Sequence, residues 1–300
     1  MDTAAWIERY KREHNAIVAA HTYQAPEIQD AADIVGDSFA LAQKAAASDA
    51  AEVLLCGVRF MAEGIKILSP AKRVVLVEPT ADCPMARQIA PERVTAFRAE
   101  HPEAAVVAYI NTTAELKAVF DVCVTSSSAV RIVRALPQRE ILFIPDANLG
   151  DYVRRQVPEK QITTWDGYCP VHARVTAGDV RAAKARYPHA KVAMHPECPP
   201  EAVALADMVG STAAIIDAIR AGDGEIIVAT ERGVVDKLGK ELPGRLHQLC
   251  RDKLTCPDMK RTTLDSLMAA MDGQGGEDIQ LDPGLMAAAR RSLENMLKFG

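Results

Sequence analysis

Short apolar runs alternate with amphipathic segments along most of the chain, and this pattern predicts alternating strands and helices. Three amphipathic stretches, at residues 7–15, 93–103 and 179–189, each precede an apolar run that ends in polar residues. These runs read AIVAAHTY, AVVAYINT and KVAMHPE. Because they are short, apolar and flanked by breakers, they are typical of buried parallel strands. The pattern predicts an α/β fold with small parallel sheets.

Two further apolar runs follow each of these predicted strands. The first of them leads through a hydroxyl-bearing turn into a helix, and reads ADIVGDS, FDVCVTS and ADMVGST in turn. The second reads EVLLCGV, EILFIPD and EIIVATE and predicts another strand. A helical stretch and a Cys-Pro pair then end each unit.

The three units keep a nearly constant step, which indicates an internal repeat. Cys83, Cys169 and Cys256 each precede a proline and are 86 and 87 residues apart. Two further landmarks, the first-strand ends and the hydroxyl turns, keep steps of 88 and 86. The first-strand ends carry His21, Tyr109 and His195, and the hydroxyl turns carry Ser38, Ser126 and Thr212.

We therefore expect three repeated α/β domains arranged with pseudo-threefold symmetry around a central site. The first spans residues 1–90 and ends near Cys83, the second spans 91–176 and ends near Cys169, and the third spans 177–257 and ends near Cys256. Residues 258–300 form a C-terminal helical tail, with the helical stretches RTTLDSLMAAM and PGLMAAARRSLENML on either side of a GQGG turn.

Charge and composition exclude some classes of function. The formal net charge of −5 lacks the basic excess that nucleic-acid binding or a lipid surface requires. The N-terminal stretch has no apolar signal core, and no apolar run reaches the roughly 18–20 residues that span a bilayer. We expect a cytoplasmic protein, where seven cysteines stay reduced and are available to bind metal.

Three equivalent thiols suggest a metal cluster at the centre of the repeat. Ligands of parallel α/β sheets bind beyond the carboxyl ends of the strands, so a threefold arrangement would bring one cysteine from each repeat to one cavity. Three thiolates suit one [4Fe–4S] cluster per chain with an iron that lacks a protein ligand. Structural zinc, the alternative, usually takes four ligands. The other cysteines, Cys56, Cys123, Cys198 and Cys250, match no shared position; we expect them to fill the core or, for Cys250, to lie inert on a helix.

The same strand ends carry polar groups. Ser38, Ser126 and Thr212 can cap helices, and helix N-termini also bind anions, so a polyanionic substrate would fit three such turns. The pairs His21 and Tyr23, Tyr109 and Asn111, and His195 and Glu197 are two residues apart and can face one side of an extended strand end. Histidine and carboxylate side chains suit proton transfer there, and tyrosine and asparagine can donate hydrogen bonds. His172, three residues after Cys169, should lie beside that cysteine. A phosphate-binding lysine loop and a dinucleotide fingerprint are both absent, so no nucleotide is expected.

The motifs AAHTYQAPEIQDAADIVGDS, AYINTTAELKA, VTSSSA, PDANLG, WDGYCPVH, HPEC, VGST and TERG occur in this order between about residues 7 and 260. Together they resemble the quinolinate synthase family of NAD (pyridine nucleotide) biosynthesis. The resemblance implies a transferase-type enzyme with three α/β domains around a [4Fe–4S] cluster. It would condense iminoaspartate with dihydroxyacetone phosphate to quinolinate, phosphate and water.

The resemblance also implies roles for individual residues. Cys83, Cys169 and Cys256 would hold the cluster, whose open iron would act as a Lewis acid. Asp258 and Met259 stand where some relatives have further cysteines, so only Cys256 remains there. Glu197 would be the main base, with His21, Tyr23 and His195 assisting proton transfer. The substrate-binding set would be His21, Ser38, Tyr109, Asn111, Ser126, His172, His195, Glu197, Ser211 and Thr212.

Other functions share part of this pattern. Another open-iron [4Fe–4S] hydro-lyase acting on small hydroxy acids would use the same cluster and anion-binding turns. A non-catalytic cluster sensor would not need His195 and Glu197, and a zinc domain would contain no sulfide. We expect small-molecule substrates and neither nucleic acid nor membrane as partners. Because iminoaspartate is unstable, an aspartate-oxidising enzyme would be a natural transient partner.

The cysteine assignment predicts which thiols the cluster needs. Replacing Cys83, Cys169 or Cys256 by serine should abolish cluster retention and activity, because serine is a poor ligand for a cluster that prefers soft thiolates. Cys56→Ser and Cys250→Ser should retain both. Iron and acid-labile sulfide analysis of anaerobically purified protein measures retention. A Cys169→Ser protein that keeps its full cluster and turnover would contradict the assignment.

Overall fold

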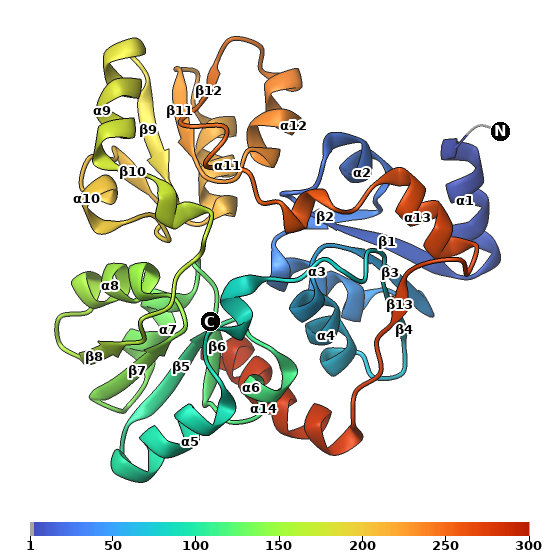
Figure 1. The fold of residues 1–300 in the computed structure, drawn as a ribbon, viewed down its shortest axis with the longest axis horizontal. Coiled ribbons are helices and arrows are strands. Elements are labelled where there is room, and N and C mark those ends of the chain that lie inside the picture. The colour runs from blue at the N-terminus through green and yellow to red at the C-terminus, as the bar shows by residue number, and fades with distance from the viewer. Residues whose placement is uncertain (1–2, 300) are drawn as a thin grey trace. The chain divides into compact units, whose positions relative to one another are not determined.

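The structure is a computed structural model that describes residues 3–299, so residues 1–2 and 300 of the predicted terminal segments lie outside it. The chain divides into two compact units, and Figure 1 labels the helices and strands of both. Unit 1 comprises the chain up to residue 83 together with 256–290, and unit 2 comprises 84–255 together with the chain from 291. These units divide the chain differently from the three domains expected from the repeat, whose bounds stay a prediction.

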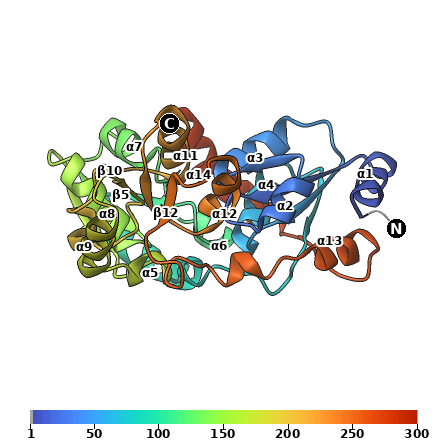
Figure 2. The same cartoon turned by 90° about the horizontal axis from the view of Figure 1, so that it is seen from above.

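Unit 1 contains one five-stranded sheet in the order β13-β4-β3-β1-β2, parallel except for β13, which pairs antiparallel with β4. Helices α1, α2 and α13 cover one face, where Ile7, Ile28 and Leu267 pack with Val18 and Leu54 (Figure 2). Its elements are α1 (Thr3–Glu13), β1 (Ala16–His21), α2 (Pro26–Ala31), β2 (Ile34–Gly36), α3 (Ser38–Ala47), β3 (Glu52–Cys56), α4 (Arg59–Leu68), β4 (Arg73–Leu76), η3 (Asp258–Lys260), α13 (Leu264–Met271) and β13 (Glu277–Asp278).

Unit 2 contains two four-stranded parallel sheets, in the orders β6-β5-β7-β8 and β10-β9-β11-β12. Its elements are η1 (Pro84–Arg87), α5 (Pro91–Glu100), β5 (Ala105–Tyr109), α6 (Ala114–Lys117), β6 (Val122–Val124), α7 (Ala129–Ala135), β7 (Glu140–Ile144), α8 (Ala147–Gln156), β8 (Gln161–Thr164), η2 (His172–Arg174), α9 (Ala177–Arg186), β9 (Lys191–Met194), α10 (Pro200–Val203), β10 (Met208–Val209), α11 (Thr212–Ala221), β11 (Ile226–Ala229), α12 (Gly233–Glu241) and β12 (Leu246–Gln248).

The same order of elements occurs three times: helix and strand alternate four times, and a 3₁₀ turn follows. In each parallel set the strand order is second, first, third, fourth. The predicted α/β class with repeated parallel sheets is therefore confirmed. All three fourth strands were missed. The strands β8 (QITT) and β12 (LHQ) are short and partly polar and lie at sheet edges, whereas β4 (RVVL) is apolar and was overlooked because the other two units show no matching apolar run.

The repeat extends to individual hydrogen bonds. In each unit of the repeat, an aspartate directly before the second strand accepts from the main-chain N–H of the first strand at 2.8 Å. A cation from the helix before the first strand pairs with each of these carboxylates. The three sets are Asp33 with Val18 and Lys11, Asp121 with Val106 and Arg98, and Asp207 with Val192 and Lys184. Each set fixes the crossover between two neighbouring strands.

The C-terminal tail contains the two predicted helices, α13 and α14 (Pro283–Phe299). Between them, Gly273 and Gly276 have φ values of 70° and 74°, a left-handed conformation that glycine adopts without strain. Helix α14 crosses the boundary between the units, which falls between Arg290 and Arg291. Over residues 3–299, no helix is both long and apolar enough to cross a membrane.

The aspartate contact predicts a loss of stability on its removal. Asp207→Ala leaves the Val192 N–H without its acceptor and should lower the free energy of unfolding by about 1–3 kcal/mol. The hydrogen bond from Val192, helped by Lys184, lowers the pKa of Asp207, so this contribution should fade as the pH falls through that pKa. Urea unfolding measures the change, with the exposed Asp223→Ala as control. Equal stability of the two variants would contradict the role.

Candidate active site

Each of the three Cys-Pro cysteines follows a chain segment that is anchored in the same way. In each case the donor is the main-chain N–H of the first residue of the helix after the third strand, or of the residue just before that helix. The acceptor is the carbonyl of the residue two positions before the cysteine. The pairs are Arg59 to Ala81 at 3.1 Å, Ala147 to Gly167 at 2.7 Å, and Arg232 to Leu254 at 2.8 Å. The repeat thus gives Cys83, Cys169 and Cys256 equivalent local settings beyond the carboxyl end of a third strand.

The loop that carries Cys169 is held from two further sides. Asp146, fully buried at the N-cap of α8, accepts from the Cys169 N–H at 3.0 Å and from the Leu149 N–H at 2.8 Å. The Gln88 side-chain amide accepts from the Tyr168 N–H at 2.8 Å and donates to its carbonyl at 3.1 Å. A Cβ on Gly167 would lie 2.3 Å from the Pro145 carbonyl oxygen, so only glycine fits there.

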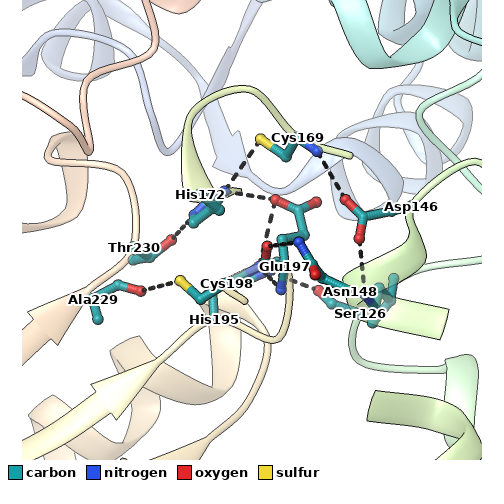
Figure 3. A network of polar contacts seen from close by, with 11 residues as sticks. Ser126, Asp146, Asn148, Cys169, His172, His195, Glu197, Cys198, Ala229 and Thr230 are labelled. Carbon is teal, nitrogen blue, oxygen red and sulfur yellow. Dashed lines mark hydrogen bonds and ion pairs between the residues drawn. The ribbon is translucent and has the colours of Figure 1, made fainter. Parts of the chain in front are cut away.

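A buried network joins Cys169 to an acid–base group (Figure 3). The Nδ1 atom of His172 lies 2.6 Å from Oε2 of Glu197 and 3.3 Å from Sγ of Cys169. Since a carboxylate only accepts, the Nδ1 proton of His172 faces Glu197. The other ring nitrogen, Nε2, lies 3.1 Å from the Thr230 hydroxyl. Tyr109 also forms a side-chain hydrogen bond to Glu197.

His195 occupies the other side of Glu197. Its ring stacks on that of His172 with centroids 4.8 Å apart, and its Nε2 lies 3.2 Å from the Ser126 hydroxyl. Its Nδ1 accepts from the Glu197 N–H at 3.4 Å, and the Asn148 amide donates to the Glu197 carbonyl at 3.0 Å. The network therefore collects residues that follow strands of both unit 2 sheets (Figure 3).

The ionisation of the network follows from burial. Burial lowers the pKa of His195 to about 4, so this ring is neutral at pH 7. Burial by itself would raise the pKa of Glu197, but the neighbouring histidines and the hydrogen bonds from His172 and Tyr109 outweigh it and lower the pKa to about 2. At pH 7, where His195 is neutral, the 2.6 Å contact with His172 still favours the ionised form of Glu197.

Asp146 shows the opposite behaviour. Burial, followed by repulsion from the Glu197 carboxylate, raises its pKa well above the ordinary value, although main-chain N–H groups oppose the shift. Two buried carboxyl groups with their pKa values moved in opposite directions are typical of sites where one group holds a proton and the other accepts one.

Unit 1 carries the first-repeat residues. His21 ends β1, and its Nδ1 accepts from the Tyr23 N–H at 3.1 Å, the same turn that His195 and Glu197 form in the third repeat. The Tyr23 ring meets the His21 ring edge-on with centroids 4.5 Å apart. Ser38 and Cys83 lie at the start of α3 and before η1. That these residues share a cavity with those of unit 2 stays a prediction.

The caps of the three helices differ from the expectation. Ser38 and Thr212 are the first residues of α3 and α11, whose caps are Asp37 and Ser211, and Ser126 lies three residues before α7. Asp37 and Ser211 accept from main-chain N–H groups, because their side chains precede the first turn and can fold back onto it. The hydroxyls of Ser38, Ser126 and Thr212 are therefore not the cap groups.

All seven cysteines lie in the described part of the chain and none forms a disulfide. Burial raises the pKa of Cys56 to about 12 and that of Cys123 to about 11, and it raises the pKa of Cys198 strongly, so these thiols fill the core as expected. Cys250 lies in a loop and not on a helix as expected, because the segment just before it, Leu246–Gln248, pairs with β11 as strand β12. Burial also raises its pKa to about 11.

Two kinds of metal-binding group fit these residues. Cys83, Cys169 and Cys256 are half-buried thiols in equivalent settings, a donor set suited to iron–sulfur ligation. Cys169, His172 and Glu197 also present ligand atoms within 4.8 Å of one another, which could hold a single ion.

Three residues of the network were not predicted from the sequence. Asp146, Asn148 and Thr230 lie within the quoted motifs PDANLG and TERG but received no role. Asp146 and Thr230 follow third strands, so the rule that ligands bind beyond strand ends could have found them. Of the remaining predicted residues of unit 2, Asn111 lies in the turn after β5, and Ser211 and Thr212 are the cap and the first residue of α11 after β10.

Comparisons with known proteins identify relatives over almost the whole chain. Residues 5–298 match the family model described as Quinolinate synthetase A protein. The chain is 44% identical to quinolinate synthase of Alkaliphilus metalliredigens over 97% of this chain and 96% of that protein. It is also 44% identical to quinolinate synthase of Methanoregula boonei over 99% of both chains. Quinolinate synthase of Dehalococcoides mccartyi is 47% identical over 89% of this chain and 88% of its own length.

The neutral state of His195 predicts a pH dependence of stability. Its folded pKa of about 4 lies below the ordinary value of 6.5, so the unfolded chain binds more protons between these values. Stability should therefore rise with pH from about 4 to about 6.5, and His195→Gln should flatten this slope by about 1–3 kcal/mol over the window. Urea unfolding of metal-free protein at several pH values measures it. Exposed His189→Gln is the control, and an unchanged slope for His195→Gln would refute the assignment.

Proposed function

The chain belongs to the quinolinate synthase family, and from this membership we propose that it condenses iminoaspartate with dihydroxyacetone phosphate to quinolinate, phosphate and water. The product would feed pyridine nucleotide biosynthesis. The observation that supports this proposal is the contact of His172 with both Cys169 and the buried Glu197, since the proposed metal ligand then lies close to the proposed base.

The proposed cofactor is one [4Fe–4S] cluster held by Cys83, Cys169 and Cys256. The equivalent anchoring of the three cysteine segments supports this ligand set. When bound, such a cluster would supply a Lewis-acidic iron for a substrate oxygen. The cluster type and the meeting of the three cysteines are parts of the proposal.

Glu197 is the proposed principal base. The carboxylate is ionised at neutral pH, and hydrogen bonds from His172 and Tyr109 stabilise its negative charge. A proton accepted by Glu197 can pass to the neutral ring of His195, whose Nδ1 lies 3.6 Å from Oε2 of Glu197. The ordered contacts of Glu197 on both its carboxylate and its carbonyl keep it in one orientation.

The substrate anions would bind at the turns beyond the strands. Ser126 and His195 already share a hydrogen bond, so a carboxylate or phosphate oxygen could exchange with either partner. The N-termini of α3 and α11, at Ser38 and at Ser211 and Thr212, add main-chain N–H groups and the positive end of the helix dipole. Asn111 would donate a further hydrogen bond. His21 and Tyr23 would transfer protons from the first repeat.

The activity is tested under anaerobic conditions. Protein with its cluster should form quinolinate when iminoaspartate and dihydroxyacetone phosphate are supplied. The absorbance of quinolinate measures its formation. Phosphate release should match quinolinate mole for mole. A hydro-lyase acting on small hydroxy acids would instead dehydrate such an acid and form no quinolinate, which would overturn the proposal.

Glu197→Gln tests the assignment of the base. The amide keeps the shape of the side chain but cannot accept a proton, so kcat should fall about 10²–10⁴-fold with the cluster absorbance intact. Glu201→Gln, an exposed change four residues away, should behave like the wild type. A Glu197→Gln enzyme with most of its kcat would shift the role of base to Tyr23 or His21.

A further inference from the structure

A buried lysine closes the turn that carries Asn111. Lys117, the last residue of α6, is fully buried, and its Nζ donates to the Ile110 carbonyl at 2.9 Å, to the Thr112 hydroxyl at 3.2 Å and to the Thr112 carbonyl. These two carbonyls flank Asn111 on either side. An ammonium group is costly to bury, so its retention at 0% exposure calls for a specific role of its contacts.

The first repeat contains the same device at the same position. Gln29 lies 88 residues before Lys117, in α2, and is 6% exposed. Its amide nitrogen donates to the Thr22 carbonyl at 3.1 Å and to the Gln24 carbonyl at 2.9 Å. These carbonyls flank Tyr23, which the 88-residue step aligns with Asn111. Two chemically different side chains thus make the same pair of contacts.

The third repeat lacks the device. The equivalent residue is Val203, which cannot donate a hydrogen bond and instead lines a small surface cavity with Pro196, Cys198 and Asn148. Here the residue at the position of Tyr23 and Asn111 is Glu197, and it is held from outside its own repeat. Asn148 binds its carbonyl, and His172 binds its carboxylate. Each of the three turns therefore has its own restraint.

We propose that Gln29 and Lys117 are positioning residues that fix the strand-end turns bearing Tyr23 and Asn111 for the reaction. A single donor that binds the carbonyls before and after a residue points both carbonyls toward itself. It thereby restricts the main chain of the residue between them, and with it the direction of that residue's side chain. The effect on catalysis rests on the proposed function, because Tyr23 and Asn111 act on substrate only if that function holds. The effect on the turn does not.

Lys160, in the same repeat as Lys117, provides a control for a merely structural role. Lys160 also bridges two main-chain carbonyls, of Leu136 and of Gln138 at 2.8 Å, but at the amino end of β7. Equivalent cations bind equivalent carbonyls in the other repeats, Lys72 those of Ser48 and Ala50, and Arg245 those of Gly222 and Gly224. Lys160→Met therefore removes a similar contact far along the strand from Asn111.

The test compares Lys117→Met, Lys117→Gln and Lys160→Met in the full chain with its cluster. Lys117→Met should raise KM for dihydroxyacetone phosphate or iminoaspartate, or lower kcat, by about tenfold or more, because small displacements of a binding group are costly. Lys117→Gln should recover most of this loss, since glutamine performs the task in the first repeat. Lys160→Met should leave kcat and KM at wild-type values even if it lowers the melting temperature.

Hydrogen exchange provides a readout that does not depend on activity. In Lys117→Met, amides of the peptide 107–113 should exchange about tenfold faster than in the wild type, while those of 136–142 stay unchanged. Lys160→Met should show the reverse. Gln29→Met should act in the same way on the peptide that contains Tyr23, which keeps the test open if Lys117→Met does not fold.

The outcomes separate the two proposals. Wild-type protein that forms no quinolinate overturns the proposed function, while faster exchange at 107–113 would still support the positioning of the turn. An active enzyme whose Lys117→Met and Gln29→Met variants keep wild-type kinetics and exchange overturns the positioning role. Equal kinetic losses in Lys117→Met and Lys160→Met, without recovery in Lys117→Gln, would also overturn it, because general destabilisation would then explain both.

Discussion

The burial of the Glu197 carboxylate is the constraint on which the candidate site depends. At 4% exposure this charge has lost most of its contact with water and must be compensated by donors within the protein. The compensation comes from residues at or beyond the ends of different strands: Tyr109 at the end of β5, His172 after β8 and, for the main chain, Asn148 after β7. Both sheets of unit 2 must therefore be folded and packed together before the carboxylate is stabilised. The ionisation of the site thus depends on the folding of the unit.

The repeat is strict where it supports the fold and divergent where it meets the site. The aspartates before the second strands and the cations at the amino ends of the third strands make equivalent contacts in all three repeats. At the carboxyl ends, equivalent positions carry Tyr23, Asn111 and Glu197, which differ in chemistry. An asymmetric reaction needs different groups at each strand end, while the packing beneath them has no such requirement.

The sequence predicted the class of fold and the strand ends that carry polar groups, because period and spacing are local properties. The apolar runs that form β1, β5 and β9 were evident, and so was the proximity of His172 to Cys169. The short edge strands β8 and β12 were missed because their residues are partly polar. The roles of Asp146 and Thr230 depend on tertiary contacts 23 and 58 residues away in the sequence, and a repeat pattern does not reveal such contacts. The caps were misassigned by one residue or more, since Asp37 competes with Ser38 for the same helix end.

The Gln88 amide has a consequence for how a ligand loop becomes ordered. It binds the main chain of Tyr168 on both its polar atoms, so the polypeptide from 88 to 168 forms a loop closed without a covalent bond. Closing a loop of this length costs conformational entropy, and the folding of unit 2 already includes this cost. Cys169, the next residue, is then presented on an anchored support, so loading of a metal there would start from an ordered thiol rather than from a freely moving segment.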